Sequence, residues 1–141
     1  MSKIAVVYWS GTGNTEQMAT LVVQGAQSAG AQVTLYTAGD FSADLVAGFD
    51  ALAFGCPSMG NEQLEESEFE PMFSACLEQL RGKKIGLFGS YGWGDGEWMR
   101  SWCDTCRSAG ALPVSDGVIC NGAPDASAEA ECQALGAALA E

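Results

Sequence analysis

Residues 3–18 read KIAVVYWSGTGNTEQM, and this stretch decides the fold. Residues 3–9 form a nearly continuous apolar run, which is typical of a β-strand buried on both faces. A turn rich in glycine and hydroxyl side chains follows at 10–15, and apolar residues at helical spacing begin at Met18. The stretch therefore predicts a strand, a tight turn and a helix in succession, the unit from which parallel α/β sheets are built.

The same alternation continues to the end of the chain. Further strands are expected at 31–37, 50–56 and 83–90 and within 112–120. Helices are expected at 14–29, 70–82, 97–110 and 127–141, with a short helix within 40–49. Strands that alternate with helices form parallel units with right-handed crossovers. We therefore expect a single domain over residues 1–141, with a doubly wound, five-stranded parallel sheet. Such sheets bind ligands at the carboxyl ends of their strands, which selects the loops at 10–15, 57–69 and 90–96.

The loop at 10–15, SGTGNT, has the composition of a phosphate-binding turn but contains no lysine or arginine. A Walker A loop requires a lysine, so nucleoside triphosphate hydrolysis is not expected. A dinucleotide-binding loop requires a third glycine where this chain has Glu16, whose carboxylate would meet the pyrophosphate. Backbone N–H groups and hydroxyls at a helix start can instead hold one phosphate monoester. The alternative is a tight turn that only caps the helix.

The other two loops offer apolar and aromatic surfaces. The sequence MGNE at 59–62 predicts a tight turn whose Gly60–Asn61 peptide could take two orientations, beside the polarizable Met59 side chain. The alternative here is an acidic, solvated loop. Trp93 stands between two glycines directly after a strand, which favours stacking on a planar ligand. An aromatic ring that carries one phosphate suits all three loops, and flavin mononucleotide (FMN) fits this description.

At these residues the chain resembles a known family. The SGTGNT loop at 10–15, the MGNE turn at 59–62 and the stretch GSYGWGDG at 89–96 are similar to those of the flavodoxins, particularly the short-chain type of anaerobic bacteria. The three motifs agree in order and spacing, and no long insertion interrupts the expected fifth strand. The resemblance implies a flavodoxin-like, three-layer α/β/α fold with strand order 2-1-3-4-5 and one tightly but non-covalently bound FMN.

The resemblance also assigns residues to the cofactor. The loop at 10–15 would hold the phosphate, Trp93 and Met59 would cover opposite faces of the isoalloxazine ring, and Glu62 would accept a hydrogen bond from ring N3–H. The backbone along the ribityl and pyrimidine side would come from Gly89, Ser90 and Gly92. The full expected set is Ser10, Gly11, Thr12, Gly13, Asn14, Thr15, Ser58, Met59, Gly60, Asn61, Glu62, Gly89, Ser90, Tyr91, Gly92, Trp93 and Gly94.

The function implied by the resemblance is low-potential, one-electron transfer between redox enzymes through FMN, without substrate turnover by the carrier itself. In relatives the corresponding turn flips on reduction. Here the Gly60 carbonyl would turn toward flavin N5 once that atom is protonated in the neutral semiquinone. An acidic protein with a charge-free pocket would disfavour the anionic hydroquinone. The alternative is an FMN-dependent NAD(P)H:quinone-type reductase, which needs a substrate pocket over a ring face that Met59 and Trp93 would cover.

The chain has 18 acidic and 6 basic residues, a net charge of -12, and no histidine. This charge opposes binding to nucleic acid and to anionic membranes. The negative charge suits redox partner proteins with basic docking faces. The resemblance implies that these partners are oxidoreductases, which the carrier would serve in place of ferredoxin. The alternative is that the charge only keeps the protein soluble. The absence of histidine excludes Ser-His and Cys-His catalysis. No signal peptide or membrane span is recognisable, so we expect a cytoplasmic protein. We also expect it to be a monomer.

Cys103 and Cys106, within WCDTC at 102–106, are similar to a thioredoxin motif. A reactive thiol of that type lies at a helix N-terminus, but the helical stretch EWMRSW precedes this pair, and Asp104 would raise a thiolate pKa. Two cysteines are also only half of a zinc or iron–sulfur ligand set. We therefore expect no metal site, and most of the six cysteines to be small buried apolar residues.

Overall fold

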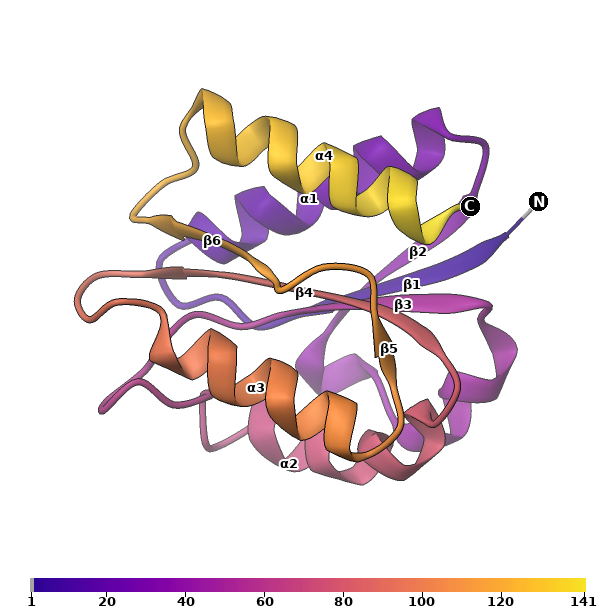
Figure 1. Cartoon of the computed structure of the whole chain (residues 1–141), viewed down its shortest axis with the longest axis horizontal. Helices are drawn as coiled ribbons and strands as arrows, with labels where there is room; N and C mark the ends of the chain where they lie inside the picture. Colours follow the sequence, from indigo (N-terminus) through magenta and orange to yellow (C-terminus); the bar gives the residue numbers. More distant parts are fainter. Residues whose placement is uncertain (1) are drawn as a thin grey trace.

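The computed structural model describes residues 2–141 and contains one parallel sheet between two layers of helices (Figure 1). The strands are β1 (Lys3–Tyr8), β2 (Gln32–Thr37), β3 (Ala51–Gly55), β4 (Lys84–Tyr91), β5 (Leu112–Pro113) and β6 (Val118–Asn121). On one face lie α1 (Asn14–Ser28) and α4 (Ala126–Leu139), and on the other α2 (Phe69–Cys76) and α3 (Glu97–Ser108). The three-layer, doubly wound fold expected from the sequence is confirmed.

The strand order is β2-β1-β3-β4-β5, as predicted, but the fifth position is occupied by two short strands. β5 pairs with the start of β4, and β6 pairs with its end. The single strand expected within 112–120 is interrupted at 114–117, where Gly117 takes a left-handed φ of 97° that a continuous strand does not allow. In the intervening segment, Asp116 accepts a hydrogen bond from the Arg107 guanidinium at 2.8 Å, which ties that segment to α3.

Two of the expected helices also differ from the prediction. The segment at 40–49 forms only short 3₁₀ turns, η1 (Ala38–Asp40) and η2 (Ala43–Gly48), in place of an α-helix. The helix expected at 70–82 is α-helical over α2 and then tightens into the 3₁₀ helix η3 (Leu77–Leu80). Short 3₁₀ turns are common as connectors between elements, as at 38–48, and at the C-terminal ends of α-helices, as at 77–80.

Alternate residues of the central strands face two separate apolar cores. Ile4 and Val6 of β1 join the core under α1 and α4, whereas Ala5 and Val7 join the core over α2 and α3. This two-sided burial explains the continuous apolar run at the start of the chain. Trp102, only 3% exposed, lies in the second core. It contacts aromatic rings of α2 edge-on, which confirms that it is a packing residue.

Helices α1 and α4 approach each other at backbone-to-backbone distance. A Cβ atom at Gly25 would lie 2.0 Å from the carbonyl oxygen of Gln133, and one at Gly136 would lie 2.1 Å from that of Val22. Any larger residue at either position would therefore force the helices apart. Because α1 begins at Asn14, within the loop at 10–15, this contact also fixes where the N-terminus of α1 points.

We predict that Gly136→Ala lowers the free energy of unfolding by about 1–3 kcal/mol, because the added methyl group meets backbone atoms that cannot rotate away. Chemical denaturation monitored by circular dichroism would measure the change. The matched control is Gly48→Ala, since no atom lies within 4 Å of the position of its Cβ. Equal stability of the two variants would contradict this account of the α1–α4 contact.

Candidate cofactor-binding site

A cavity of about 280 Å³ lies at the carboxyl edge of the sheet. The loops that follow β1, β3 and β4 all contribute to it. Its lining residues are Trp9, Gly11, Thr12, Asn14, Pro57, Ser58, Met59, Ser90, Tyr91, Gly92 and Gly122. The three loops that the sequence selects for ligand binding therefore meet at one place, although they are far apart along the chain.

The loop between β1 and α1 is held closed by the side chain of Ser10. Its Oγ accepts hydrogen bonds from the backbone N–H groups of Gly13 at 3.0 Å and Glu16 at 3.3 Å. Gly13 takes a φ of 98°, a left-handed conformation that turns the chain into α1. Ser10 therefore shapes the loop from within.

The N-terminus of α1 presents backbone donors and polar side chains at this loop. Thr12 and Asn14 line the cavity, whereas Thr15 is buried and its Oγ1 lies 3.3 Å from the Oγ of Ser90. Within residues 2–141, the backbone N–H groups of Asn14 and Thr15 have no hydrogen-bond acceptor. Such unpaired donors, with the helix dipole, attract an anion. No lysine or arginine is among the lining residues, so an anion at this place would depend on backbone N–H groups and polar side chains.

The turn after β3 is a short hairpin closed by Met59 and Gln63. The backbone N–H of each residue donates to the carbonyl of the other, at 2.8 and 2.9 Å. Between them, Gly60 has a φ of 52° and Glu62 a φ of 54°. The Gly60–Asn61 peptide makes no hydrogen bond within the part of the chain that the structure describes. The tight turn expected from the sequence is present, and no hydrogen bond from the described residues holds its central peptide in one orientation.

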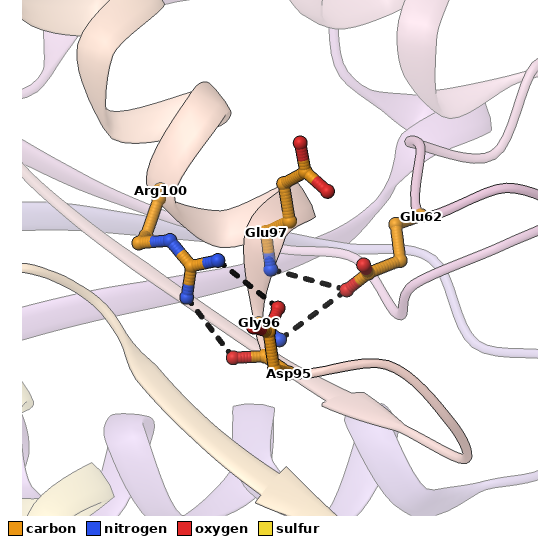
Figure 2. A network of polar contacts seen from close by, with 5 residues as sticks. All are labelled: Glu62, Asp95, Gly96, Glu97 and Arg100. Carbon is orange, nitrogen blue, oxygen red and sulfur yellow. Dashed lines mark hydrogen bonds and ion pairs between the residues drawn. The ribbon is translucent and has the colours of Figure 1, made fainter.

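The side chain of Glu62 reaches from this turn to the start of α3, as Figure 2 shows. Its Oε1 accepts hydrogen bonds from the backbone N–H groups of Gly96 at 3.3 Å and Glu97 at 3.1 Å. On the same segment, the Arg100 guanidinium donates to the backbone oxygen and the carboxylate of Asp95, both at 3.0 Å. The turn after β3 and the loop after β4 are therefore joined by side chains.

Met59 and Trp93 are exposed although they are apolar. Met59 is 37% exposed and lines the cavity, and Trp93 is 61% exposed beside Gly92, which also lines it. By contrast, Trp98 is 2% exposed and lies in the core. Exposure of two large apolar side chains at one edge is characteristic of a binding surface.

Glu65 anchors the remainder of the loop after β3. It is one of the few buried charged or polar residues, and its carboxylate accepts hydrogen bonds from the backbone N–H groups of Ser67, Glu68 and Phe69 and from the Ser67 hydroxyl. Burial opposes its ionisation, but these four hydrogen bonds outweigh that effect and lower the pKa to about 2. Glu65 therefore caps α2 as a carboxylate.

The structure brings the expected residues to the cavity in two groups. Those that line it are Gly11, Thr12, Asn14, Ser58, Met59, Ser90, Tyr91 and Gly92. Those that flank it without lining it are Ser10, Gly13, Thr15, Gly60, Asn61, Glu62, Gly89, Trp93 and Gly94. Gly89 serves close contact inside the sheet, since a Cβ there would lie 2.1 Å from the Cys56 carbonyl oxygen.

Sequence reasoning missed three lining residues: Trp9, Pro57 and Gly122. Trp9 belongs to the apolar run that predicts a buried strand, but its position at the carboxyl end of that strand is a signal that could have identified it. Pro57 falls inside a selected loop without a distinctive side-chain signal. Gly122 follows the interrupted fifth strand, whose loop was not selected.

The six cysteines are free and buried. Cys103 and Cys106 lie in the middle of α3, as predicted, and burial raises the pKa of both thiols, that of Cys106 to about 12. A thiol with a raised pKa holds little thiolate and reacts slowly. The thioredoxin-like reading of WCDTC therefore has no support in the structure.

Comparison with known proteins agrees with this geometry. The family model described as flavodoxin matches residues 6–135. The chain belongs to the flavodoxin family. It is 45% identical to a flavodoxin of Megasphaera elsdenii over 98% of both chains, and 44% identical to one of Clostridium beijerinckii over 96% of this chain and 97% of that one. The solution structure of two-electron reduced Megasphaera elsdenii flavodoxin superposes with a TM-score of 0.90, at 46% identity over 97% of this chain and 98% of that one.

These findings confirm the resemblance to short-chain flavodoxins of anaerobic bacteria. As a flavodoxin, the chain binds FMN and transfers electrons between redox proteins. It is an electron carrier and does not turn over a substrate of its own, so the quinone-reductase alternative is not favoured. Across residues 2–141, no helix has the length and apolar character needed to cross a membrane.

We predict that Glu65→Gln lowers the free energy of unfolding at pH 7 by about 1–3 kcal/mol, because buried hydrogen bonds to a carboxylate are lost. The pKa of Glu65 is lower in the folded chain than its ordinary value of 4.5. Its contribution is therefore complete above that value and disappears as the pH falls from about 4.5 to about 2. Urea denaturation between pH 7 and pH 3 would show a smaller loss of stability for the variant than for the wild type. Glu78→Gln, which changes an exposed glutamate, is the control and should be about as stable as the wild type at pH 7. A wild-type pH profile in Glu65→Gln would contradict the prediction.

Proposed function

We propose that the cavity at the carboxyl edge of the sheet holds the FMN cofactor, with the three loops as its binding residues. The observation that carries this proposal is the meeting of an open helix N-terminus and two exposed apolar side chains at one cavity. The first feature suits a phosphate and the second suits a flat aromatic ring. One ligand with both groups, held along one cavity, accounts for all three loops.

The loop at 10–15 suits the phosphate of FMN. The unpaired N–H groups of Asn14 and Thr15 would donate to its oxygens, and the cavity-lining Thr12 and Asn14 side chains would complete the contacts. Ser10 already uses its Oγ to close the loop, so it would shape the site more than it contacts the phosphate. A cation is not required because the helix dipole and the backbone donors supply the positive potential.

The exposed Trp93 ring and the exposed Met59 thioether suit the flat isoalloxazine ring of FMN. Met59 would cover one face of the ring and Trp93 the other, since the two lie on separate loops that flank the same cavity. A ring covered on both faces is shielded from water and leaves an edge for electron transfer. This arrangement supports a carrier over an enzyme that must admit a substrate above the ring.

Bound FMN supplies the capacity to accept and release electrons one at a time. The protein tunes this through the Gly60–Asn61 peptide, which can offer either its carbonyl or its N–H to the cavity because neither group has a partner within residues 2–141. A hydrogen bond that forms in one redox state only shifts the potential by its own free energy. Carboxylates around the site, such as Glu62, Glu66 and Glu68, disfavour added negative charge and support a low potential for the last electron.

We predict that the purified chain binds one equivalent of FMN and that Trp93→Ala weakens this binding about tenfold or more, because a stacking surface is lost. Quenching of FMN fluorescence on titration would measure the dissociation constants. Leu112→Ala, a truncation of an equally exposed residue on β5, is the control and should bind FMN as the wild type does. Stepwise reduction followed by visible absorption would then show whether the electrons enter singly. A wild-type chain that fails to bind FMN would end the proposal.

The charges of the chain are unevenly distributed, which supports a basic redox partner at the FMN end. At the opposite, amino edge of the sheet, β1 begins with Lys3 and β4 with Lys84. Other cations at that edge are Arg81, Lys83 and Arg107, just before β4 and near the end of α3. The sixth cation, Arg100, lies near the cavity but is paired with Asp95. The end that carries the cavity is therefore strongly acidic, and a basic partner surface would be steered toward it.

We predict that the double variant Glu66→Gln/Glu70→Gln, at the acidic end, slows electron transfer to a basic c-type cytochrome several-fold at low ionic strength. The control Glu78→Gln/Glu141→Gln makes the same change in net charge at the opposite end and should have a much smaller effect. Stopped-flow measurements at rising salt should bring the rates together, because exposed charges are screened. Equal slowing by both double variants would show that only net charge matters.

We further propose that the chain works as a single-domain monomer in the cytoplasm. The family match covers nearly all of the chain, and the curated relatives align with it over almost their whole length, which supports one domain. The high negative charge disfavours self-association. Sedimentation at micromolar concentration would detect a dimer if one formed.

A further inference from the structure

The turn after β3 and the first turn of α3 are connected by one side chain. The Oε1 of Glu62 accepts hydrogen bonds from the backbone N–H groups of Gly96 and Glu97 (Figure 2). These are among the first N–H groups of α3, which cannot find an acceptor inside the helix. Gly96, at the helix N-cap, has no side-chain cap of its own. Glu62 therefore supplies, from a distant part of the chain, the cap that α3 lacks.

The loop before α3 is shaped to receive this carboxylate. A Cβ atom at Gly94 would lie 2.5 Å from the Glu62 carboxyl carbon and 2.6 Å from Oε1, so a side chain there would displace Glu62. Arg100 holds the neighbouring Asp95 through its backbone oxygen and its carboxylate, which keeps the loop closed behind Gly96. Figure 2 shows the side chain of Glu97 directed away from Glu62. Within residues 2–141, Glu62 is the only residue of the turn whose side chain hydrogen-bonds to the start of α3.

The backbone of Glu62 is strained in a way that serves this contact. Its φ of 54° is the only positive φ of a residue other than glycine within residues 2–141. A side chain in this conformation costs free energy that surrounding contacts must offset. The two hydrogen bonds to α3 are the contacts that the structure shows for the side chain.

We propose that Glu62 is a positioning residue that fastens the 59–63 turn to the N-terminus of α3, so that the two loops flanking the cavity are held as one unit. The fastening leaves the Gly60–Asn61 peptide as the movable part of the turn. Trp93 directly precedes Gly94 on the loop after β4, so the fastening also fixes the position of Trp93 relative to Met59 on the turn. The consequence for FMN rests on the proposed function, but the fastening itself is a property of the protein chain.

The test is amide hydrogen exchange at Gly96 and Glu97, measured by NMR on the full-length chain with FMN and without it. We expect exchange at both amides to be about tenfold faster in Glu62→Ala, because each loses a hydrogen bond to a charged acceptor. Glu62→Gln keeps an acceptor oxygen at the same reach and should restore most of the protection. Glu62→Asp keeps the charge, but its side chain is one methylene shorter, so we expect it not to restore the protection of the two amides. Glu97→Gln, the control, removes a carboxylate from the same helix turn and should leave exchange unchanged.

Three results would overturn the proposal. Unchanged exchange in Glu62→Ala would show that the hydrogen bonds do not protect the amides. Faster exchange in the FMN-bound chain alone would show that Glu62 acts only through the bound group. Equal increases in amide exchange in Glu97→Gln and Glu62→Ala would show that only negative charge near the helix start matters, and not the hydrogen bonds of Glu62. If Glu62→Ala does not fold, the Gln and Asp variants make the same comparison. Loss of FMN binding would not affect the exchange that is measured without FMN. Failure of the proposed FMN site can therefore be distinguished from failure of the proposal for Glu62.

Discussion

An anionic phosphate has to be held by a chain whose own net charge is -12, and the rest of the site depends on how that is done. No lysine or arginine lines the cavity. In the proposed site the attraction comes from the N-terminus of α1, where backbone N–H groups of the described residues have no acceptors and the helix dipole is positive. This requires α1 to start at one fixed place and direction. Ser10 sets the start from inside the loop, and the glycine contact between α1 and α4 sets the direction.

Each of the other two loops is fixed by a different carboxylate. Glu65 caps α2 from within its own loop, and Glu62 caps α3 from the neighbouring one. Both use a negative charge to satisfy helix donors, the same chemistry that the phosphate would use at α1. The edge of the sheet therefore presents two helix N-termini that are capped by carboxylates, and a third, that of α1, which we propose for the phosphate. Because a protein with many carboxylates has these groups available, its acidity contributes to the structure as well as to partner recognition.

Much of the fold was readable from the sequence because apolar runs and glycine-bounded helices are local signals. The chain order of strands and helices, the buried pair Trp98 and Trp102, and the helical setting of Cys103 all followed from spacing. The interruption of the fifth strand did not, since the left-handed conformation of Gly117 within it has no apolar signal in the sequence. The additional role of Glu62 was also hidden, because its partners are backbone groups 34 and 35 residues away. Side-chain patterns carry no record of backbone donors that come together only in the folded chain.

The burial of the cysteines has a consequence for the chemistry of an electron carrier. Burial raises the pKa of Cys56, Cys106 and Cys132 to about 12, so these thiols remain protonated under physiological conditions. A protonated, inaccessible thiol is a poor target for peroxide and for disulfide exchange. Reduced flavins in air are a source of such oxidants, and an exposed thiolate beside one would be consumed with use. The cysteines of the interior are therefore unreactive although the protein carries a redox cofactor. This favours resistance to oxidative damage over many cycles of reduction and oxidation.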